Sequence, residues 1–477
     1  MSNKAKAING AKWTTISTVV NTCLQFGQVA ILARLLEPTA FGLVSISTLV
    51  LNFLSIFAHF GFSNSIIYKQ ESDKNILSTI YFLNIMVGIL MFIVIYFTAP
   101  LLVLYYKEPE LAEILRLAAF YFPIVFLGQI YNILLEKELQ FKSLALTEII
   151  CSVLGTSITI YFAYQGYQAK ALIFGLLSAQ FLKMIIQNII ARKYFFPSIH
   201  FDLSKIKEHL RFGIFNIGES VISFANNNLD TIFIGGFLDV KQLGYYTIAS
   251  QIAVYPVSRL CPIIIQICYP IMAKIKDNLG QLKNAYLKII DFLTFCNIPL
   301  LVGLFLMAEN VVPLIYGPGW EPTVPLIKIF IFMGIFSCLV YPLSTVAYST
   351  GKPNLLFYLS LVMLVLKFPI IYFASNYGIL GIAVGFLITS FIAVILNFIL
   401  IQRMLGSFMK PFLENLSKPI MFSLSMVVVI LLYRQFIGNL GLVHTVIQIA
   451  LGGAVYGVLT LKYKISFSEL KSLRSSL

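Results

Sequence analysis

The chain has 477 residues, of which 59% are hydrophobic and only 11% are charged. A soluble domain carries about a quarter charged residues, so this composition excludes an ordinary soluble fold and indicates a lipid bilayer as the main solvent. The net charge of +14 does not indicate a nucleic-acid partner, because the lysines and arginines lie mainly between apolar runs. There they set topology and meet the anionic head groups of membrane lipids.

The apolar runs predict an all-α integral membrane protein with about fourteen transmembrane helices, since each crossing takes roughly 20 mostly apolar residues. In chain order the expected spans are 13–33, 41–62, 76–105, 115–135, 143–163, 169–190, 212–235, 243–273, 285–308, 324–349, 354–374, 378–402, 416–436 and 443–461. The first run has no clean cleavage site for a signal peptidase, so we expect it to remain as an uncleaved span.

The loops between these spans carry unequal positive charge. With the N-terminus in the cytoplasm, the inner segments hold roughly four times as many lysines and arginines as the outer ones, which fits the positive-inside rule. An even number of spans then places both termini in the cytoplasm. The longest hydrophilic stretch, 191–211, is expected to hold a short interfacial helix. The predicted division is an N-terminal lobe at 1–190, this linker, a C-terminal lobe at 212–402, and two additional spans with a basic tail at 403–477.

An internal repeat supports the two lobes. The segment LEPTAFGL at 36–43 recurs as LDVKQLGY at 238–245, at an offset of 202 residues. The same offset relates two polar helix faces. Span one carries Thr14, Thr18, Asn21, Gln25 and Gln28 on one face, and the positions 202 residues further on are Asn216, Ser220, Ser223, Asn227 and Asp230. Such repeats are common in transporters, whose substrate sites lie between the repeated halves.

These polar faces have two interpretations. Their side chains can join neighbouring helices by hydrogen bonds worth about 1 kcal/mol each, or they can line an aqueous cavity. Because the two faces are related by the repeat, we favour a central cavity between two pseudo-symmetric lobes, with Asn52 of span two on the same wall. The glycine pairs Gly381/Gly385 and Gly453/Gly457 predict close helix packing instead.

Ionisable residues inside spans indicate where a charged ligand binds, since each costs roughly 2.5–3.5 kcal/mol at a helix centre. Lys183, Arg259 and Lys367 lie deep in spans six, eight and eleven without an obvious local partner. A cationic cavity suits a diphosphate group, which arginine can bind bidentately. Glu219 and Asp230 are the best candidates for coupling to a cation, with H⁺ or Na⁺ as the ion.

The sequence has no nucleotide-binding loop, no dinucleotide fingerprint and no cluster with metal-ligand spacing, and its six cysteines all lie inside apolar runs. We therefore expect no cofactor, no metal site and no catalytic residue. Transport without an ATP site must be driven by an ion gradient, the membrane potential or the gradient of the substrate.

The N-terminal part resembles a known family. The text INGAKW at 8–13, ARLLEPTAFGL at 33–43 and FGFSNSII at 60–67 is similar to the polysaccharide transporter family of the multidrug/oligosaccharidyl-lipid/polysaccharide exporter superfamily. Within this family the chain looks like the bacterial O-antigen, colanic-acid and teichuronic-acid flippases. The resemblance is strongest over 1–150 and extends more loosely to the last spans.

The resemblance implies a flippase of the bacterial inner membrane. Its cargo is undecaprenyl-diphosphate-linked oligosaccharide, moved from the cytoplasmic to the outer leaflet by alternating access, for surface polysaccharides such as the O-antigen of lipopolysaccharide. Cavity lysines and arginines are expected to meet the diphosphate. Arg34 matches the family's Arg-Leu-Leu block, whereas Arg259 and Lys367 carry over only by their position in matching helices. A polymerase and glycosyltransferases are the expected protein partners.

Three alternatives stay open. A multidrug or organic-cation antiporter of the same superfamily would favour acids and aromatic residues in the cavity, and the deep cations argue against it. A membrane enzyme, such as an oligosaccharide polymerase or ligase, would need a catalytic constellation and longer outer loops than this sequence has. A lipid II flippase for peptidoglycan is poorly separated from the leading interpretation.

Overall fold

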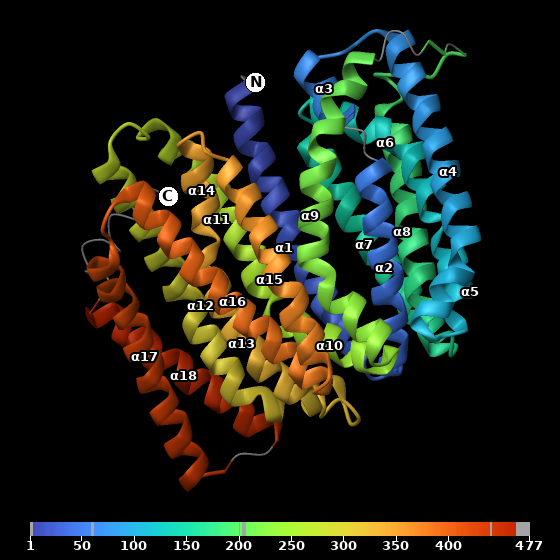
Figure 1. Ribbon diagram of the computed structural model, residues 1–477. Helices are drawn as coiled ribbons and strands as arrows, with labels where there is room; N and C mark the ends of the chain where they lie inside the picture. Colours follow the sequence, from blue (N-terminus) through green and yellow to red (C-terminus); the bar gives the residue numbers. More distant parts are fainter. Residues whose placement is uncertain (1–2, 59–61, 200, 203–206, 439–440, 464–477) are drawn as a thin grey trace. The chain divides into compact units, whose positions relative to one another are not determined.

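The computed structural model describes residues 3–58, 62–199, 201–202, 207–438 and 441–463 (Figure 1). The chain forms two compact units, Met1–Gly244 and Tyr245–Leu477. In Figure 1 the first unit runs from blue to green and the second from green to red. The described residues form helices joined by turns, with no strand among them.

The described residues of the first unit form nine helices and the start of a tenth. They are α1 (Asn3–Leu32), α2 (Pro38–Ala58), α3 (Phe62–Lys69), α4 (Lys74–Tyr106), α5 (Glu110–Ala118), α6 (Tyr121–Lys137), α7 (Phe141–Tyr164), α8 (Gln168–Ala191), α9 (Lys207–Phe237) and the first turn of α10 (Val240–Ala253). The second unit holds the rest of α10 together with α11 (Tyr255–Lys274), α12 (Leu279–Tyr316), α13 (Thr323–Val340), α14 (Pro342–Ser349), α15 (Asn354–Ser375), α16 (Gly378–Leu405), α17 (Met409–Phe436) and α18 (Leu442–Tyr463).

Among the described residues, 12 helical segments are long and apolar enough to cross a membrane. The prediction of an all-α, multi-pass membrane protein is therefore confirmed. The expected spans 212–235 and 243–273 coincide with α9 and with α10 and α11, which are helical but do not belong to those 12 segments. The count of fourteen spans stays a prediction.

The boundary between the predicted lobes differs from the division in the structure. We expected an interfacial helix within 191–211, but the described residues 192–199 are not helical. The helix α9 begins at Lys207 and belongs to the first unit, although the repeat places it at the start of the second half. The predicted division into lobes at 1–190 and 212–402, with two additional spans at 403–477, stays a prediction.

Close packing in the first unit depends on small residues. The helices α7 and α8 approach each other where a Cβ on Gly155 would lie 2.7 Å from Ala179 Cβ and a Cβ on Gly175 would overlap Thr159. Backbones can come this close only where side chains are minimal, which is a common way to pair helices in a bilayer. Towards the C-terminal end of α6, an apolar core that includes Ile80, Ile130 and Phe195 packs α6 against α4 and against the segment that follows α8.

The two repeated segments contact each other within the first unit. A Cβ on Gly42 would overlap the carbonyl of Val240, and a Cβ on Gly244 would overlap the carbonyl of Pro38. Adding 202 to positions 38 and 42 gives positions 240 and 244, so the two contacts are equivalent under the repeat. We call this reciprocal contact the glycine crossing.

The glycine pairs outside this crossing behave differently from each other. A Cβ on Gly381 would overlap the carbonyl of Ala374, and one on Gly385 would lie 3.0 Å from Ala374 Cβ, so this pair packs α16 against α15 as predicted. The prediction was wrong for Gly453 and Gly457, because a Cβ at either position meets no atom within 4 Å. These two glycines face open space and pack against no described helix.

Candidate functional site in the first unit

A polar pocket of about 500 Å³ lies among the helices of the first unit. Its polar lining comes from four helices: Thr14 and Ser17 of α1, Asn132 and Glu136 of α6, Glu148 of α7, and Lys183 and Gln187 of α8. An adjoining cavity of about 330 Å³ shares Asn132, Glu136, Lys183 and Gln187 with it. The shared residues make the two cavities one polar site, which we call the α6–α8 pocket.

One wall of the α6–α8 pocket is held by a hydrogen-bond chain between α1 and α7. Ser17 Oγ donates to Glu148 Oε2 at 3.2 Å, and Asn21 Nδ2 donates to Ser17 Oγ at 3.2 Å. Ser17 is only 2% exposed, so its hydroxyl needs a protein partner and fixes the carboxylate in turn. Ser17 and Asn21 are one helical turn apart, which puts both on the side of α1 that faces α7.

The opposite wall connects α6 with α8. Asn132 Nδ2 donates to Glu136 Oε1 at 2.7 Å, and Gln187 Nε2 donates to Asn132 Oδ1 at 2.7 Å. Gln187 is 3% exposed. The two amides therefore orient the Glu136 carboxylate toward the pocket. Polar side chains that are buried in membrane helices are uncommon and usually have a functional role.

The electrostatics of the pocket are set by Glu136, Glu148 and Lys183. With all three ionised, the lining carries one net negative charge. Such a site has donors and acceptors for the hydroxyl groups of a sugar, and it can accept a proton or a cation. It is less suited to a bare anion, because the two carboxylates outweigh the ammonium group.

Sequence reasoning found only part of this site. Lys183 was predicted as a deep cation without a local partner, and the structure places two carboxylates from α6 and α7 around the same pocket. Asn132, Gln187 and Glu136 were not predicted. The available signal was the spacing of four residues between Asn132 and Glu136 and between Lys183 and Gln187, which puts each pair on one helix face.

One part of the predicted polar face of α1 adjoins the α6–α8 pocket, and another part packs against α7. Asn21 adjoins the α6–α8 pocket through Ser17. Gln28 Oε1 instead accepts a hydrogen bond of 3.1 Å from Thr156 Oγ1 of α7, which is a helix-to-helix contact. Gln25 is half-buried on α1 between them.

The other predicted residues of the first unit lie away from this pocket. Asn52 is exposed on α2. Asn227 is exposed on α9, where its Nδ2 donates to Ser223 Oγ at 3.4 Å, and Asp230 Oδ1 accepts from the backbone of the next residue at 2.8 Å. Arg34 is exposed in the turn between α1 and α2. The side chain of Glu219, also on α9, lies outside the described residues.

Two of the predicted cations belong to the second unit. Lys367 of α15 has its Nζ 5.7 Å from the centre of the Phe386 ring on α16, a cation–π contact. It therefore has a partner that the spacing within its own helix could not reveal. Arg259 lies on α11, and its side chain lies outside the described residues.

An all-helical chain with many membrane-crossing segments and a charged, hydrogen-bonding pocket inside one helical unit has the build of a membrane transporter. Comparison with known proteins places it more narrowly. The chain belongs to the family of polysaccharide biosynthesis proteins, whose model matches residues 31–325. This membership confirms the resemblance found in the N-terminal residues.

Two curated relatives are similar over most of their length. The chain is 29% identical to the lipopolysaccharide biosynthesis protein WzxC of Escherichia coli over 431 residues, which cover 90% of this chain and 88% of that protein. It is 30% identical to the teichuronic acid biosynthesis protein TuaB of Bacillus subtilis over 419 residues, covering 85% of this chain and 86% of that protein.

Solved structures show the same fold at low sequence identity. The lipid II flippase MurJ in an inward closed conformation matches with a TM-score of 0.76 at 15% identity, covering 95% of this chain and 98% of that one. An inward-facing multidrug resistance transporter of the MATE family matches with a TM-score of 0.58 at 15% identity, covering 80% of this chain and 95% of that one. This second protein is a member of the MOP superfamily.

Proposed function

We propose that this chain is a flippase that moves undecaprenyl-diphosphate-linked oligosaccharide from the cytoplasmic to the outer leaflet of the bacterial inner membrane. The observation that carries the proposal is similarity over nearly the whole chain to proteins of lipopolysaccharide and teichuronic acid biosynthesis. The fold shared with a protein described as a lipid II flippase supports it. The product would feed surface polysaccharide synthesis, with a polymerase and glycosyltransferases as neighbours in the pathway.

The α6–α8 pocket would serve the sugar part of this cargo. Sugar hydroxyls lose their hydration on entering a membrane protein, and amide and carboxylate groups can replace those hydrogen bonds. Asn132, Glu136, Glu148 and Gln187 provide such groups in fixed orientations. Asn21, Gln25, Gln28, Asn52 and Asn227 remain proposed contacts for the same cargo.

The diphosphate needs cations instead. Arg259 and Lys367, with Arg34, are the proposed contacts, because guanidinium and ammonium groups match phosphate oxygens. Lys183, which lines the α6–α8 pocket, remains a proposed contact for the cargo beside the two carboxylates. Alternating access would carry the charged head across the bilayer without exposing it to lipid. Glu219 and Asp230 are the proposed groups for coupling to H⁺ or Na⁺.

The orientation belongs to the proposal as well. Both termini would lie in the cytoplasm, as the excess of lysine and arginine in alternate loops indicates. Single cysteines placed in the turns after α4 and after α8 should react with an impermeant maleimide from opposite sides of the membrane. Labelling of both turns from the same side would contradict this topology.

Deletion of the gene in its native host tests the function. Loss of the flippase should abolish surface polymer and trap undecaprenyl-linked oligosaccharide in the inner leaflet, and a plasmid copy should restore export. The measurement is surface polysaccharide by immunoblot together with lipid-linked intermediates by mass spectrometry. Normal polymer in the deletion strain, with no accumulated intermediate, would contradict the proposal.

A second candidate is a multidrug or organic-cation antiporter, and the net negative charge of the α6–α8 pocket is the observation that favours it. The two functions predict different phenotypes for the same deletion. An antiporter would leave surface polymer intact and make the cells more sensitive to cationic dyes and antibiotics. Deletion of a flippase would instead reduce the surface polymer.

A further inference from the structure

An apolar groove of about 420 Å³ lies between α11 and α12 in the second unit. Its lining includes Cys268, Ile271 and Met272 of α11 and Ile289 and Phe292 of α12. Ile271 is 58% exposed and Phe292 is 54% exposed, so the groove opens at the surface of the protein. Exposed apolar surface of this kind marks a site where a membrane or another apolar partner is bound.

One cation lies within this apolar lining. Lys288 of α12 lines the groove and is exposed. Its ammonium group forms no hydrogen bond or ion pair with any residue that the structure describes. A charged group beside hydrocarbon is unfavourable unless water or a counter-ion meets it. Lys288 is therefore available to an anionic ligand that enters the groove.

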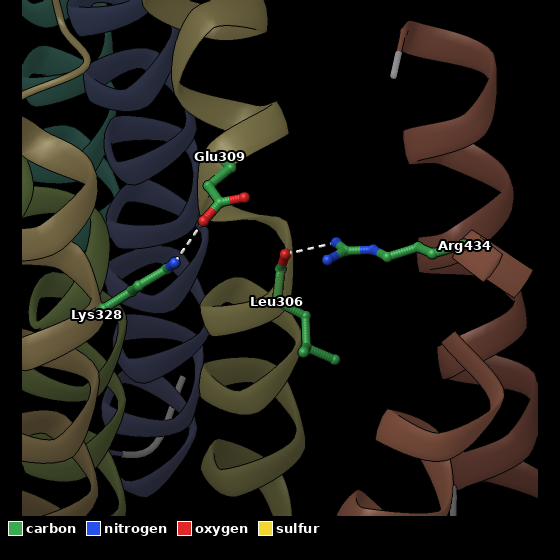
Figure 2. A network of polar contacts seen from close by, with 4 residues as sticks. All are labelled: Leu306, Glu309, Lys328 and Arg434. Atoms are coloured by element: carbon green, nitrogen blue, oxygen red, sulfur yellow. Dashed lines mark hydrogen bonds and ion pairs between the residues drawn. The ribbon is translucent and has the colours of Figure 1, made fainter. Parts of the chain in front are cut away.

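Other cations of the second unit have protein partners. Figure 2 shows the guanidinium of Arg434 on α17, whose Nη2 donates to the Leu306 carbonyl at 2.5 Å. The same view shows Lys328 of α13 in an ion pair of 2.6 Å with Glu309. Lys288 differs from both, because its acceptor comes from solvent or from a ligand and not from the described part of the chain.

Another side of α12 is covered by α18. Tyr456 of α18 donates its hydroxyl to the carbonyl of Phe295 at 2.8 Å. Pro299 has no N–H, so this carbonyl lacks its usual donor four residues along α12. Asp291, one helical turn after Lys288, acts electrostatically on this tyrosine and does not line the groove. The groove lining thus carries a positive charge and no negative one.

The lysine lies at the depth where lipid head groups meet acyl chains. From Leu279, where α12 begins, to Lys288 the axial distance is about 14 Å. A lysine side chain can direct its ammonium group back toward the membrane surface while its methylene groups stay among apolar atoms. Lys274 and Lys276 are exposed where α11 ends, and their charge outweighs that of the exposed Asp277 beside them. This end of the helix pair therefore attracts anionic head groups.

We propose that the groove binds one acyl chain of an anionic glycerophospholipid, whose phosphate lies against Lys288. The site goes beyond the proposed function, because its ligand is a resident lipid of the membrane and not the cargo. The acyl chain covers the exposed side chains of Ile271 and Phe292, and the phosphate supplies the acceptor that Lys288 lacks. In the proposed orientation this end of α12 faces the cytoplasm, so the lipid belongs to the inner leaflet.

The charge of the head group decides which lipid binds. A zwitterionic head group brings an ammonium group of its own close to Lys288, and like charges repel. An anionic head group without an amine has the phosphate and no such penalty. The groove should therefore prefer phosphatidylglycerol to phosphatidylethanolamine when the acyl chains are the same.

Photolabelling of the purified full-length chain in detergent tests the proposal. The probes are phosphatidylglycerol and phosphatidylethanolamine that carry the same diazirine on an acyl chain, and labelled peptides are located by mass spectrometry. Phosphatidylglycerol should label 268–272 and 285–292 about tenfold more strongly than phosphatidylethanolamine does. Unlabelled phosphatidylglycerol should compete for both peptides.

Variants separate the charge from the groove. Lys288→Gln should remove most of the preference for phosphatidylglycerol, and Lys288→Arg should keep it. Lys352→Gln is the control, because it removes an exposed lysine from the turn after α14 and should leave labelling unchanged. Ala285 also lines the groove, so Ala285→Leu should reduce labelling by both lipids. Melting temperatures near that of the wild type confirm that each variant is folded.

Three results would overturn the inference. Equal labelling of the wild type by the two lipids would show that no anion is selected, and undiminished labelling of Lys288→Gln by phosphatidylglycerol would place the head group elsewhere. Stronger competition by a polyprenyl phosphate than by phosphatidylglycerol would show that the groove does not serve a phospholipid. The assay involves no transport, so its result is independent of polysaccharide export.

Discussion

Ser17 Oγ donates a hydrogen bond of 3.2 Å to the carboxylate of Glu148, and this contact joins α1 to α7 at the wall of the α6–α8 pocket. The serine is almost fully buried, so the carboxylate is its hydrogen-bond acceptor inside the unit. The contact holds Glu148 in one orientation across the pocket from the amides of α6 and α8. A charged group that is fixed in this way can bind a ligand without first being ordered.

Neutralising this carboxylate should therefore impair transport more than stability. Glu148→Gln keeps an acceptor for Ser17 but removes one of the two negative charges of the α6–α8 pocket. We expect surface polymer to fall about tenfold, the equivalent of roughly 1.4 kcal/mol, at unchanged protein abundance. The measurement is polymer output against membrane protein level. Glu138→Gln is the control, because Glu138 is exposed at the end of α6. Equal output from the two variants would contradict a transport role for Glu148.

The proposed diphosphate contact on α11 makes a sharper prediction. Arg259→Ala should abolish surface polysaccharide and leave the protein inserted and abundant, because a buried phosphate without its cation loses several kcal/mol. Arg403→Ala is the control, since Arg403 is exposed at the end of α16. Polymer and membrane abundance are measured in the same cells. Normal polymer from Arg259→Ala would remove this residue from the cargo site.

The glycine crossing should tolerate no side chain. Gly42→Ala or Gly244→Ala would push a methyl group into a backbone carbonyl, and overpacking of this kind costs about 1–3 kcal/mol. We expect the melting temperature in detergent to fall by several degrees in each variant. Gly27→Ala provides the control, because a Cβ there meets no atom within 4 Å. It should melt at or above the wild-type temperature, since alanine favours the helix.

Acidic pH should stabilise the turn that follows α4. Burial raises the pKa of Glu108, and the nearby charges of Glu110 and Asp239 raise it further. A carboxyl with a raised pKa binds its proton more tightly in the folded state, so its contribution is present at low pH and is lost as pH rises through the folded pKa. The melting temperature should thus fall as the pH rises above the ordinary pKa of a glutamate, and less steeply in Glu108→Gln. An equal slope in both proteins at low salt would contradict this.

The contact between Tyr456 and the carbonyl freed by Pro299 should contribute measurably to stability. Tyr456→Phe keeps the ring and removes the hydroxyl, which leaves the Phe295 carbonyl without its donor. The expected loss is about 1 kcal/mol, seen as a lower melting temperature. Tyr463→Phe serves as the control, because Tyr463 is exposed at the end of the same helix. Identical melting of the two variants would show that the hydrogen bond is replaced by solvent.

Periodicity and hydropathy predicted which segments are helical, because every membrane helix must satisfy its backbone internally and cover itself with apolar side chains. The α6–α8 pocket was harder to predict from the sequence, since it depends on which helices become neighbours in the folded chain. Glu136 falls just past the expected span 115–135 and reads as a loop residue, yet α6 extends to Lys137 and carries it into the pocket. Likewise, the ring under Lys367 belongs to the next helix, beyond the reach of spacing rules.

The glycines at 453 and 457 also show that spacing within one helix does not predict what the helix packs against. A small-xxx-small pattern shows that one face of a helix carries only small side chains. It does not show which residues pack against that face. In this chain the face at 381 and 385 meets another helix, whereas a Cβ at 453 or 457 would meet no atom within 4 Å.

The two contacts of the glycine crossing are reciprocal, and this restricts the substitutions that the chain can accept at either glycine. Each repeated segment supplies the glycine for one contact and the carbonyl for the other, so the nearest atom in each contact belongs to the backbone and cannot rotate away to admit a substitution. A larger residue at 42 or at 244 can be accommodated only by moving two backbone segments at once, which alters the second contact as well. Among related sequences, the two positions should therefore change together or not at all, and a chimera that joins halves from diverged relatives should work only when both glycines are present.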